Sequence, residues 1–120
     1  MGALAVLLAV PSITTVFANT ENEAGGGLVI VTDNDVIDPT LRATPQYIYN
    51  KGKKIGYWIS GKRDGKVVSE YKAYTGEGFA SVTNGKGNYN DGGWQPAESW
   101  SRASLTWTRE GTNRANYNYR

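Results

Sequence analysis

The 120-residue chain contains no cysteine and no histidine. Without cysteine it can form no disulfide framework, thiol nucleophile or cysteine-ligated metal site. Without histidine it has no Ser–His triad and no imidazole base that titrates near neutral pH. Carboxylates, lysines and tyrosines are the groups left for acid–base chemistry, which excludes most enzyme mechanisms. We therefore expect a protein that is not an enzyme and needs no cofactor or metal.

Long apolar runs are also missing. Residues 3–10 form a short hydrophobic run that Pro11 interrupts, whereas a membrane span takes about 20 apolar residues. Short or small residues before Asn19 suit cleavage after Ala18, although no basic residue precedes Arg42 to supply the usual charged start of a signal. The alternative is a buried apolar helix. We expect residues 1–18 to be a signal peptide and the protein to be secreted, and the lack of cysteine favours a Gram-positive exporter.

Basic side chains are scarce in the first half of the chain. Residues 1–50 carry five acidic side chains against Arg42 alone, whereas residues 51–120 carry twelve basic and six acidic side chains and all four tryptophans. Such asymmetry indicates that the two halves have different roles. We expect residues 51–120 to form the working domain. Residues 19–50 should be a weakly ordered acidic pro-segment or linker with a flexible hinge at 24–27 and a short strand at 28–31, or else an acidic strand and loop that lies against the basic half.

From Tyr47 onward, short aromatic-rich segments alternate with a period of two residues, and no segment has a helical period. Asp64-Gly65 and Asn84-Gly85 are hairpin signals. Strands are predicted at residues 47–49, 55–60, 67–74, 79–83, 98–108 and 114–119. The pattern predicts an all-β domain, a small antiparallel β-sandwich or barrel.

The core of such a domain must consist largely of aromatic side chains. Below roughly 70–80 residues a single core seldom supplies more than ~3–5 kcal/mol, and each large aromatic side chain buries on the order of 150–250 Å². A homodimer would also help by hiding a sheet edge. The predicted core residues are Ala80, Val82, Trp100, Ala103, Leu105, Trp107, Ala115 and Tyr117.

Six short motifs follow one another along the second half of the chain. They are Gly56-Tyr57-Trp58, Val67-Val68-Ser69-Glu70-Tyr71, Ala80-Ser81-Val82-Thr83-Asn84, Gly93-Trp94 with Pro96, Trp100-Ser101-Arg102-Ala103-Ser104, and Asn113-Arg114-Ala115-Asn116-Tyr117-Asn118. In this order, behind a signal peptide, they resemble the lactococcin 972 family of secreted bacteriocins. The resemblance covers about residues 52–120.

The resemblance implies a small antiparallel β-sandwich that is secreted without modification or cofactor. It implies binding to the cell-wall precursor lipid II of sensitive Gram-positive cells and a block of septum formation without pores. It also implies an ability to dimerise, a membrane immunity protein and an ABC transporter. The chain departs from the family in lacking its histidines, with Lys72, Ala73 and Gly78 at those places, and in having Ile55 before Gly56 where the family has a glycine pair.

Apart from the family resemblance, the basic charge and the aromatic side chains of residues 51–120 suit a ligand that carries an anionic group and a sugar. Six basic side chains lie within residues 51–66 and could hold a pyrophosphate or approach an anionic surface, or they could simply solubilise edge strands. Trp94, in a glycine-rich loop, is predicted to stack on a sugar, the alternative being a plug over one end of the sandwich. The candidate target-binding residues are Trp58, Lys62, Arg63, Tyr71, Lys72, Tyr74 and Trp94.

Three other functions compete with an antibacterial one. A nucleic-acid binder would share the basic and aromatic composition, but a secretory signal and the lack of an RNP-like strand argue against it. A glycosidase needs two carboxylates across a cleft, and most of the acidic residues here lie in turns or beside Lys or Arg. A non-toxic cell-wall or carbohydrate-binding adhesion module would use the same fold, charge and aromatics, and it is the main alternative.

Overall fold

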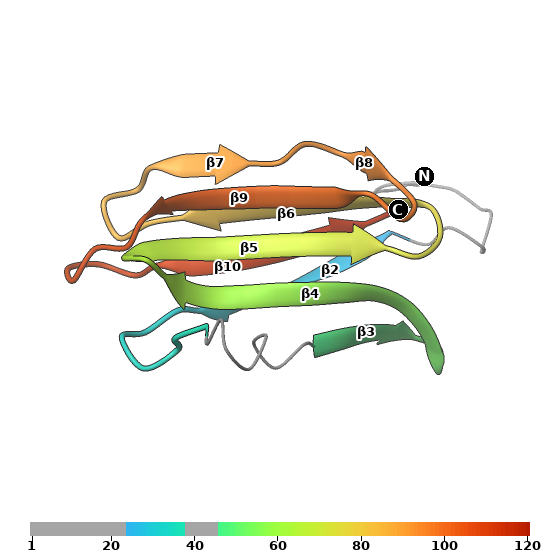
Figure 1. Cartoon of the computed structure of the whole chain (residues 1–120), viewed down its shortest axis with the longest axis horizontal. Helices are drawn as coiled ribbons and strands as arrows, with labels where there is room; N and C mark the ends of the chain where they lie inside the picture. The colour runs from blue at the N-terminus through green and yellow to red at the C-terminus, as the bar shows by residue number, and fades with distance from the viewer. Residues whose placement is uncertain (1–23, 38–45) are drawn as a thin grey trace, which may run out of the picture.

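The computed structural model describes residues 24–37 and 46–120, which form two antiparallel sheets packed face to face (Figure 1). The four-stranded sheet has the order β3 (Gln46–Asn50), β4 (Lys53–Arg63), β5 (Lys66–Ala73) and β9 (Trp100–Thr106). The other sheet has the order β2 (Gly25–Ile30), β10 (Arg114–Tyr119), β6 (Glu77–Thr83) and β7 (Tyr89–Asp91), with β8 (Gln95–Pro96) also paired to β6. The predicted all-β sandwich is confirmed, and the predicted signal peptide, 1–18, lies outside the described residues.

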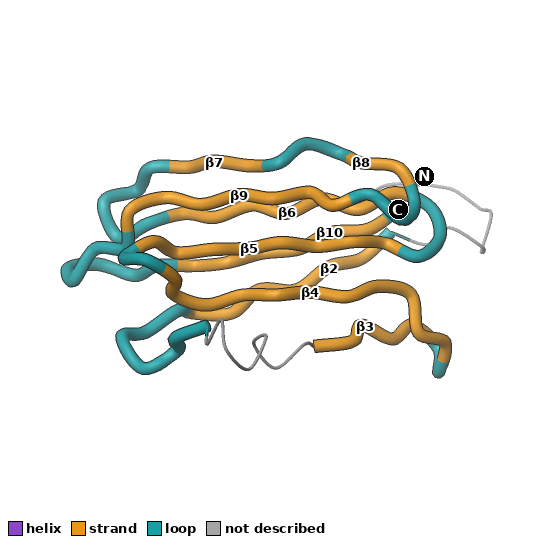
Figure 2. The backbone as a smooth tube through the Cα atoms, viewed as in Figure 1, coloured by secondary structure: helices purple, strands orange, loops and turns teal. Residues whose placement is uncertain are grey.

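The hairpin between β4 and β5 forms as the sequence predicts. Asp64 and Gly65 make the turn with φ values of 54° and 74°, and Arg63 pairs with Lys66. Positive φ at both central residues is the geometry of the type I′ turn, whose twist matches that of the flanking strands. Strands and connecting loops account for the described chain in Figure 2.

The hairpin between β6 and β7 forms with a different turn from the predicted one. Asn84 is buried, and its side-chain oxygen accepts hydrogen bonds from the backbone N–H groups of Lys86 (3.0 Å) and Asn88 (3.1 Å). Positive φ falls on Gly87, at 86°. Gly85 is needed for another reason, because a Cβ there would collide with the carbonyl of Glu110.

Two strands that precede residue 51, Gly25–Ile30 and Gln46–Asn50, are part of the sandwich. β2 pairs with β10 from Gly25 opposite Tyr119 to Ile30 opposite Arg114, and β3 pairs with β4. The predicted hinge is therefore strand. A Cβ on Gly25 or Gly27 would collide with the ring of Tyr119 or Tyr117, and a Cβ on Gly26 would collide with the carbonyl of Tyr117 and the side chain of Asn118. The prediction of a weakly ordered linker is wrong for the described residues, and the alternative of a strand and loop against the basic half is what the structure has. A domain boundary at 51 would remove two strands.

The core between the sheets is a run of aromatic rings. Tyr117 lies with its ring centroid 4.6 Å from that of Trp58 and 5.1 Å from that of Tyr71, and Tyr119 continues the run at 6.3 Å. The predicted core is confirmed for Ala80, Val82, Ala103 and Ala115, which are buried, and for Leu105, Trp107 and Tyr117, which are partly buried and pack against them.

Three aromatic side chains do not lie where the sequence predicted them, and the alternation of side chains along the strands explains why. Trp58 and Tyr71 face each other in register and are 2% and 0% exposed, so the prediction that they contact a target is wrong. Trp100, predicted in the core, lies on the outer face, because its neighbour Ser101 and then Ala103 occupy the inward positions of β9. Successive side chains of a strand point to opposite faces.

Of two buried hydroxyl groups in this core, that of Ser69 is hydrogen-bonded and that of Tyr71 is not. The indole N–H of Trp58 donates to Ser69 Oγ (2.9 Å), which donates to the carbonyl of Asn116 (2.7 Å) and so links the two sheets. The hydroxyl of Tyr71 is buried with no hydrogen-bond partner among the described residues, and burial raises its pKa. Gly56 and Gly78 make room for this ring, since a Cβ on Gly78 would lie 2.7 Å from it.

We therefore expect opposite effects from removing the two hydroxyls. Tyr71→Phe should leave the free energy of unfolding unchanged or raise it by about 1 kcal/mol, because it removes an unsatisfied polar group. Ser69→Ala should lower it by about 1–3 kcal/mol, because the Trp58 N–H and the Asn116 carbonyl lose their partner. Urea unfolding followed by tryptophan fluorescence measures both values, and a larger loss for Tyr71→Phe than for Ser69→Ala would contradict this account.

Candidate functional site

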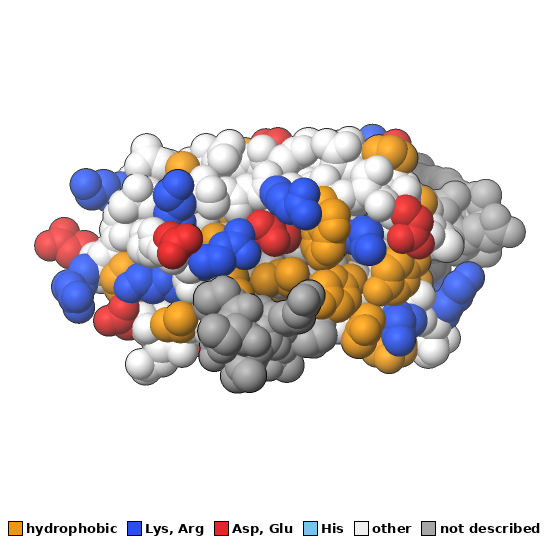
Figure 3. Space-filling view, in the orientation of Figure 1, with side chains coloured by type: hydrophobic (Ala, Val, Ile, Leu, Met, Phe, Trp, Pro, Cys, Tyr) orange, Lys and Arg blue, Asp and Glu red, His pale blue; other side chains and the backbone are white. Residues whose placement is uncertain are grey.

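The outer face of the four-stranded sheet carries a row of side chains that crosses all four strands. Tyr47 pairs with Tyr57, Tyr57 with Lys72, and Lys72 with Trp100. Directly opposed side chains in antiparallel strands have Cβ atoms about 4.5–5.5 Å apart, so these four form one continuous surface, here called the aromatic row. Figure 3 looks onto this face, where hydrophobic side chains lie next to those of Lys and Arg.

The rings of the aromatic row contact one another at their edges. The centroid of Tyr57 lies 5.3 Å from that of Tyr47 and 5.7 Å from that of Trp100, both in T-shaped geometry. Edge-to-face pairs are favourable beyond the area they bury. The three rings therefore form a preformed apolar surface that is partly open to solvent, since Tyr47 is 42% exposed and Tyr57 and Trp100 are partly buried.

Cations lie over the faces of these rings. Lys54 Nζ is 4.0 Å from the ring centroid of Tyr47, and Lys72 Nζ is 5.3 Å from that of Trp100. The guanidinium carbon of Arg102 is 5.0 Å from the Trp100 ring. Such contacts contribute about 0.5–1 kcal/mol each at exposed sites. Lys72 Nζ also lies 3.8 Å from Glu98 Oε1, so this charge has an acidic partner at the edge of the site.

Tyr74 extends the site beyond the end of β5. Its ring lies 6.0 Å from Lys72 Nζ, and partial burial raises its pKa, with further contributions from Tyr47, Glu98 and other tyrosines. The phenol is therefore neutral at physiological pH and can both donate and accept a hydrogen bond. The face thus offers apolar rings, hydroxyls and permanent cations.

The structure disperses the predicted target-binding residues. Lys72 and Tyr74 lie in the site, and Arg63 lies further along the same face. Trp94 lies in the loop between β7 and β8, beside the other sheet, where its ring centroid is 5.0 Å from that of Phe79 of β6.

Four residues of the site were not among the candidates that the sequence offered, namely Tyr47, Tyr57, Trp100 and Arg102, whereas Lys54 belongs to the predicted basic cluster of residues 51–66. The alternation of β9 contained the signal for two of them. Placing Ser101 and Ala103 inward requires Trp100 and Arg102 to point outward.

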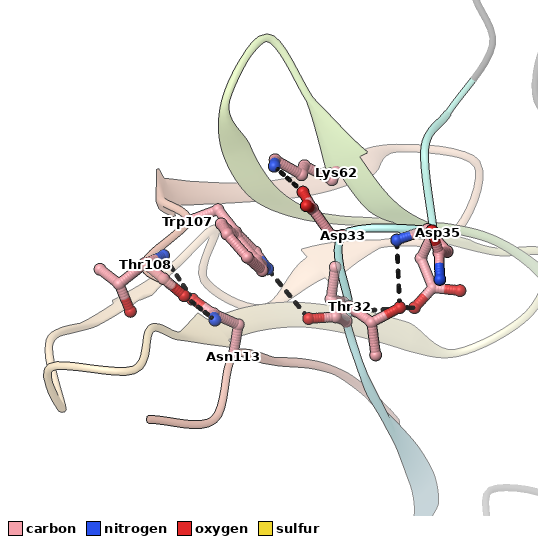
Figure 4. Close-up of polar contacts among 9 residues, drawn as sticks. Thr32, Asp33, Asp35, Lys62, Trp107, Thr108 and Asn113 are labelled. Carbon is pink, nitrogen blue, oxygen red and sulfur yellow. Dashed lines mark hydrogen bonds and ion pairs between the residues drawn. The ribbon is translucent and has the colours of Figure 1, made fainter. Parts of the chain in front are cut away.

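Lys62 has a different role from the predicted one. It forms an ion pair with Asp33 at 2.5 Å and lies over the ring of Trp107 at 3.9 Å (Figure 4). The indole N–H of Trp107 in turn donates to the carbonyl of Val31 (3.0 Å). Lys62 and Trp107 therefore hold the segment that follows β2 against the sandwich. Asn113 adds a third contact, because its carbonyl accepts from the N–H of Val31 (2.8 Å).

The Asp33 ion pair should respond to pH. The hydrogen bond and charge of Lys62 hold the pKa of Asp33 below its usual value of 3.8. A carboxylate with a lowered pKa stabilises the fold above its ordinary pKa and loses that contribution as the pH falls through the lowered one. We expect an NMR titration of the Asp33 carboxyl to give a midpoint below 3.8 that rises in Lys62→Met. An unchanged midpoint in this variant would show that the pair does not form in solution.

The described residues thus define a small all-β sandwich with an aromatic and cationic outer face. In residues 24–37 and 46–120, no cluster of three or more potential metal-ligating side chains occurs, and no helix has the length and hydrophobicity of a membrane span. Comparisons with family models, with curated proteins and with solved structures found no match to the chain.

Proposed function

We propose that this protein is a secreted antibacterial protein of the lactococcin 972 type, which binds the cell-wall precursor lipid II of Gram-positive bacteria and blocks septum formation without catalysis. The observation that supports this proposal best is the aromatic row with its flanking cations. Lipid II presents sugar rings joined to a diphosphate. Sugars stack on exposed aromatic faces, and ammonium and guanidinium groups bind phosphate oxygens with charge-assisted hydrogen bonds.

The position of Lys72 bears on the departure from the family pattern. The family tends to carry histidines at the places that Lys72, Ala73 and Gly78 occupy here. Ala73 and Gly78 are buried, whereas Lys72 stands in the aromatic row. Lys72 therefore places an ammonium group in the row where the family tends to have an imidazole.

The basic residues near β3 support approach to a bacterial surface. Lys53 and Lys54 begin β4 beside the aromatic row and are exposed. Each basic side chain near an anionic membrane surface contributes about 1 kcal/mol. The same charges would serve the second candidate, a non-toxic cell-wall or carbohydrate-binding adhesion module, because that module also needs the row. The two functions differ in what happens to the bound cell.

The binding part of the proposal is tested with one tryptophan on each outer face. Trp100→Ala should lower the affinity for lipid II in vesicles at least tenfold, a loss of about 1.4 kcal/mol or more, with little change in thermal unfolding. Trp94→Ala is the matched control on the other sheet, and its affinity should stay within twofold of the wild type. Co-sedimentation with the vesicles measures both. A loss confined to Trp94→Ala would place the target on the opposite face.

The toxic part is tested on living cells. The secreted protein should stop septum formation in a sensitive Gram-positive indicator strain, and Trp100→Ala should require at least ten times more protein for the same effect. Fluorescence microscopy of labelled protein and stained septa gives both readouts. Cells that bind the protein yet divide normally would exclude the bacteriocin and favour the adhesion module.

A further inference from the structure

Beside the aromatic row, two arginines share one carboxylate. Glu70 and Arg102 are paired in register on β5 and β9, two residues along the strands from Lys72 and Trp100. Arg63 Nη2 donates to Glu70 Oε2 at 2.7 Å, and Arg102 Nε lies 3.8 Å from the same oxygen. The spacing of two residues along a strand is about 7 Å.

Arg63, Glu70 and Arg102 together carry a net charge of one positive unit. The side chain of Glu70 is 13% exposed and that of Arg102 is 59% exposed, so the carboxylate lies beneath the surface and the Arg102 guanidinium lies at it. A separation of 3.8 Å is too long for a hydrogen bond. The Arg102 Nε–H is therefore not committed to Glu70, while guanidinium N–H groups have the fork geometry that binds phosphate.

A shallow depression of about 250 Å³ opens at these side chains. It is lined by Arg63, Glu70, Arg102, Asn90, Ala103 and Ser104. The side-chain amide of Asn90 donates to the carbonyl of Ser104 at 3.1 Å, which joins β7 of one sheet to β9 of the other. The depression is thus supported by both sheets and has polar as well as charged walls.

Arg102 connects the depression to the aromatic row. Its guanidinium carbon is 5.0 Å from the ring of Trp100, and its Nε faces Glu70. A ligand that places a sugar on the Trp100 end of the row can therefore place the group attached to that sugar in the depression. With a positive excess there, the attached group that fits is an anion.

From this geometry, and resting on the proposed function, we propose that the depression at Arg63, Glu70 and Arg102 is a phosphate subsite, and that the ligand is a glycosyl phosphate whose sugar stacks on the aromatic row. Arg102 binds the phosphate oxygens, with Arg63 as the second cation. Glu70 holds the arginines in place but repels the anion. The phosphate can be the diphosphate of a lipid-linked precursor or the phosphodiester of an anionic wall polymer.

The test measures the affinity of the full secreted chain for inorganic pyrophosphate by isothermal titration calorimetry. Arg102→Gln should weaken binding at least fivefold, because it removes the surface guanidinium. Glu70→Gln should strengthen binding at least fivefold, because it removes the repelling charge. Arg114→Gln, which takes the same charge from the other sheet, should change the affinity by less than twofold. Thermal unfolding of each variant verifies the fold, and Arg63→Gln, expected to weaken binding, replaces Glu70→Gln if that variant does not fold.

Weaker binding in Glu70→Gln, or equal binding in Arg102→Gln and Arg114→Gln, would overturn the subsite. The same variants are then assayed with lipid II vesicles and with glucosylated polyglycerol phosphate, which distinguishes the two sources of phosphate. If Trp100→Ala abolishes lipid II binding but Arg102→Gln does not, the subsite is wrong and the proposed function stands. If the affinities for pyrophosphate follow the predicted order while glucosylated polyglycerol phosphate binds and lipid II does not, the subsite stands and the proposed function fails.

Discussion

The sandwich depends on two large side chains, those of Trp58 and Tyr71, filling the space between its sheets. Neighbouring β4 and β5 supply them, and Tyr117 of the opposite sheet meets both rings. In a chain without cysteine, this aromatic contact takes the part that disulfides have in many small secreted domains. Its requirements extend beyond the rings, since Gly78 must lack a Cβ and Ser69 must bridge the indole to β10.

The candidate site follows from the same alternation. A strand that points Trp58 and Tyr71 inward has to point Tyr57 and Lys72 outward, because successive side chains take opposite faces. Register then aligns these outward residues with Tyr47 and Trp100 into one row. The aromatic row of the candidate site is therefore carried by the strands of the sheet itself, whose other face packs in the core.

The difference in charge between the two halves of the chain also has a structural consequence. Part of the acidic first half packs against the basic second half, with Asp33 on Lys62 and the carbonyl of Val31 on the Trp107 indole. The glycines of β2 allow this close approach, because a Cβ on Gly25 or Gly27 would collide with a tyrosine ring of β10, and one on Gly26 with the carbonyl of Tyr117 and the side chain of Asn118. A run of glycines suggests a hinge when the residues opposite it are unknown. Here the glycines are required because β10 approaches β2 closely.

Local pattern was enough to predict the all-β class, the β4–β5 and β6–β7 hairpins and most of the core, because alternation and turn residues act within a few positions of the chain. It was not enough to place Trp58 inside and Trp100 outside, since an aromatic side chain suits either face of a half-buried strand. Nor could it pair β2 with β10, which lies at the other end of the chain, or bring Arg63, Glu70 and Arg102 together from three strands. Those arrangements depend on strand order and register, which are decided by contacts between distant segments and by which faces the packed sheets bury.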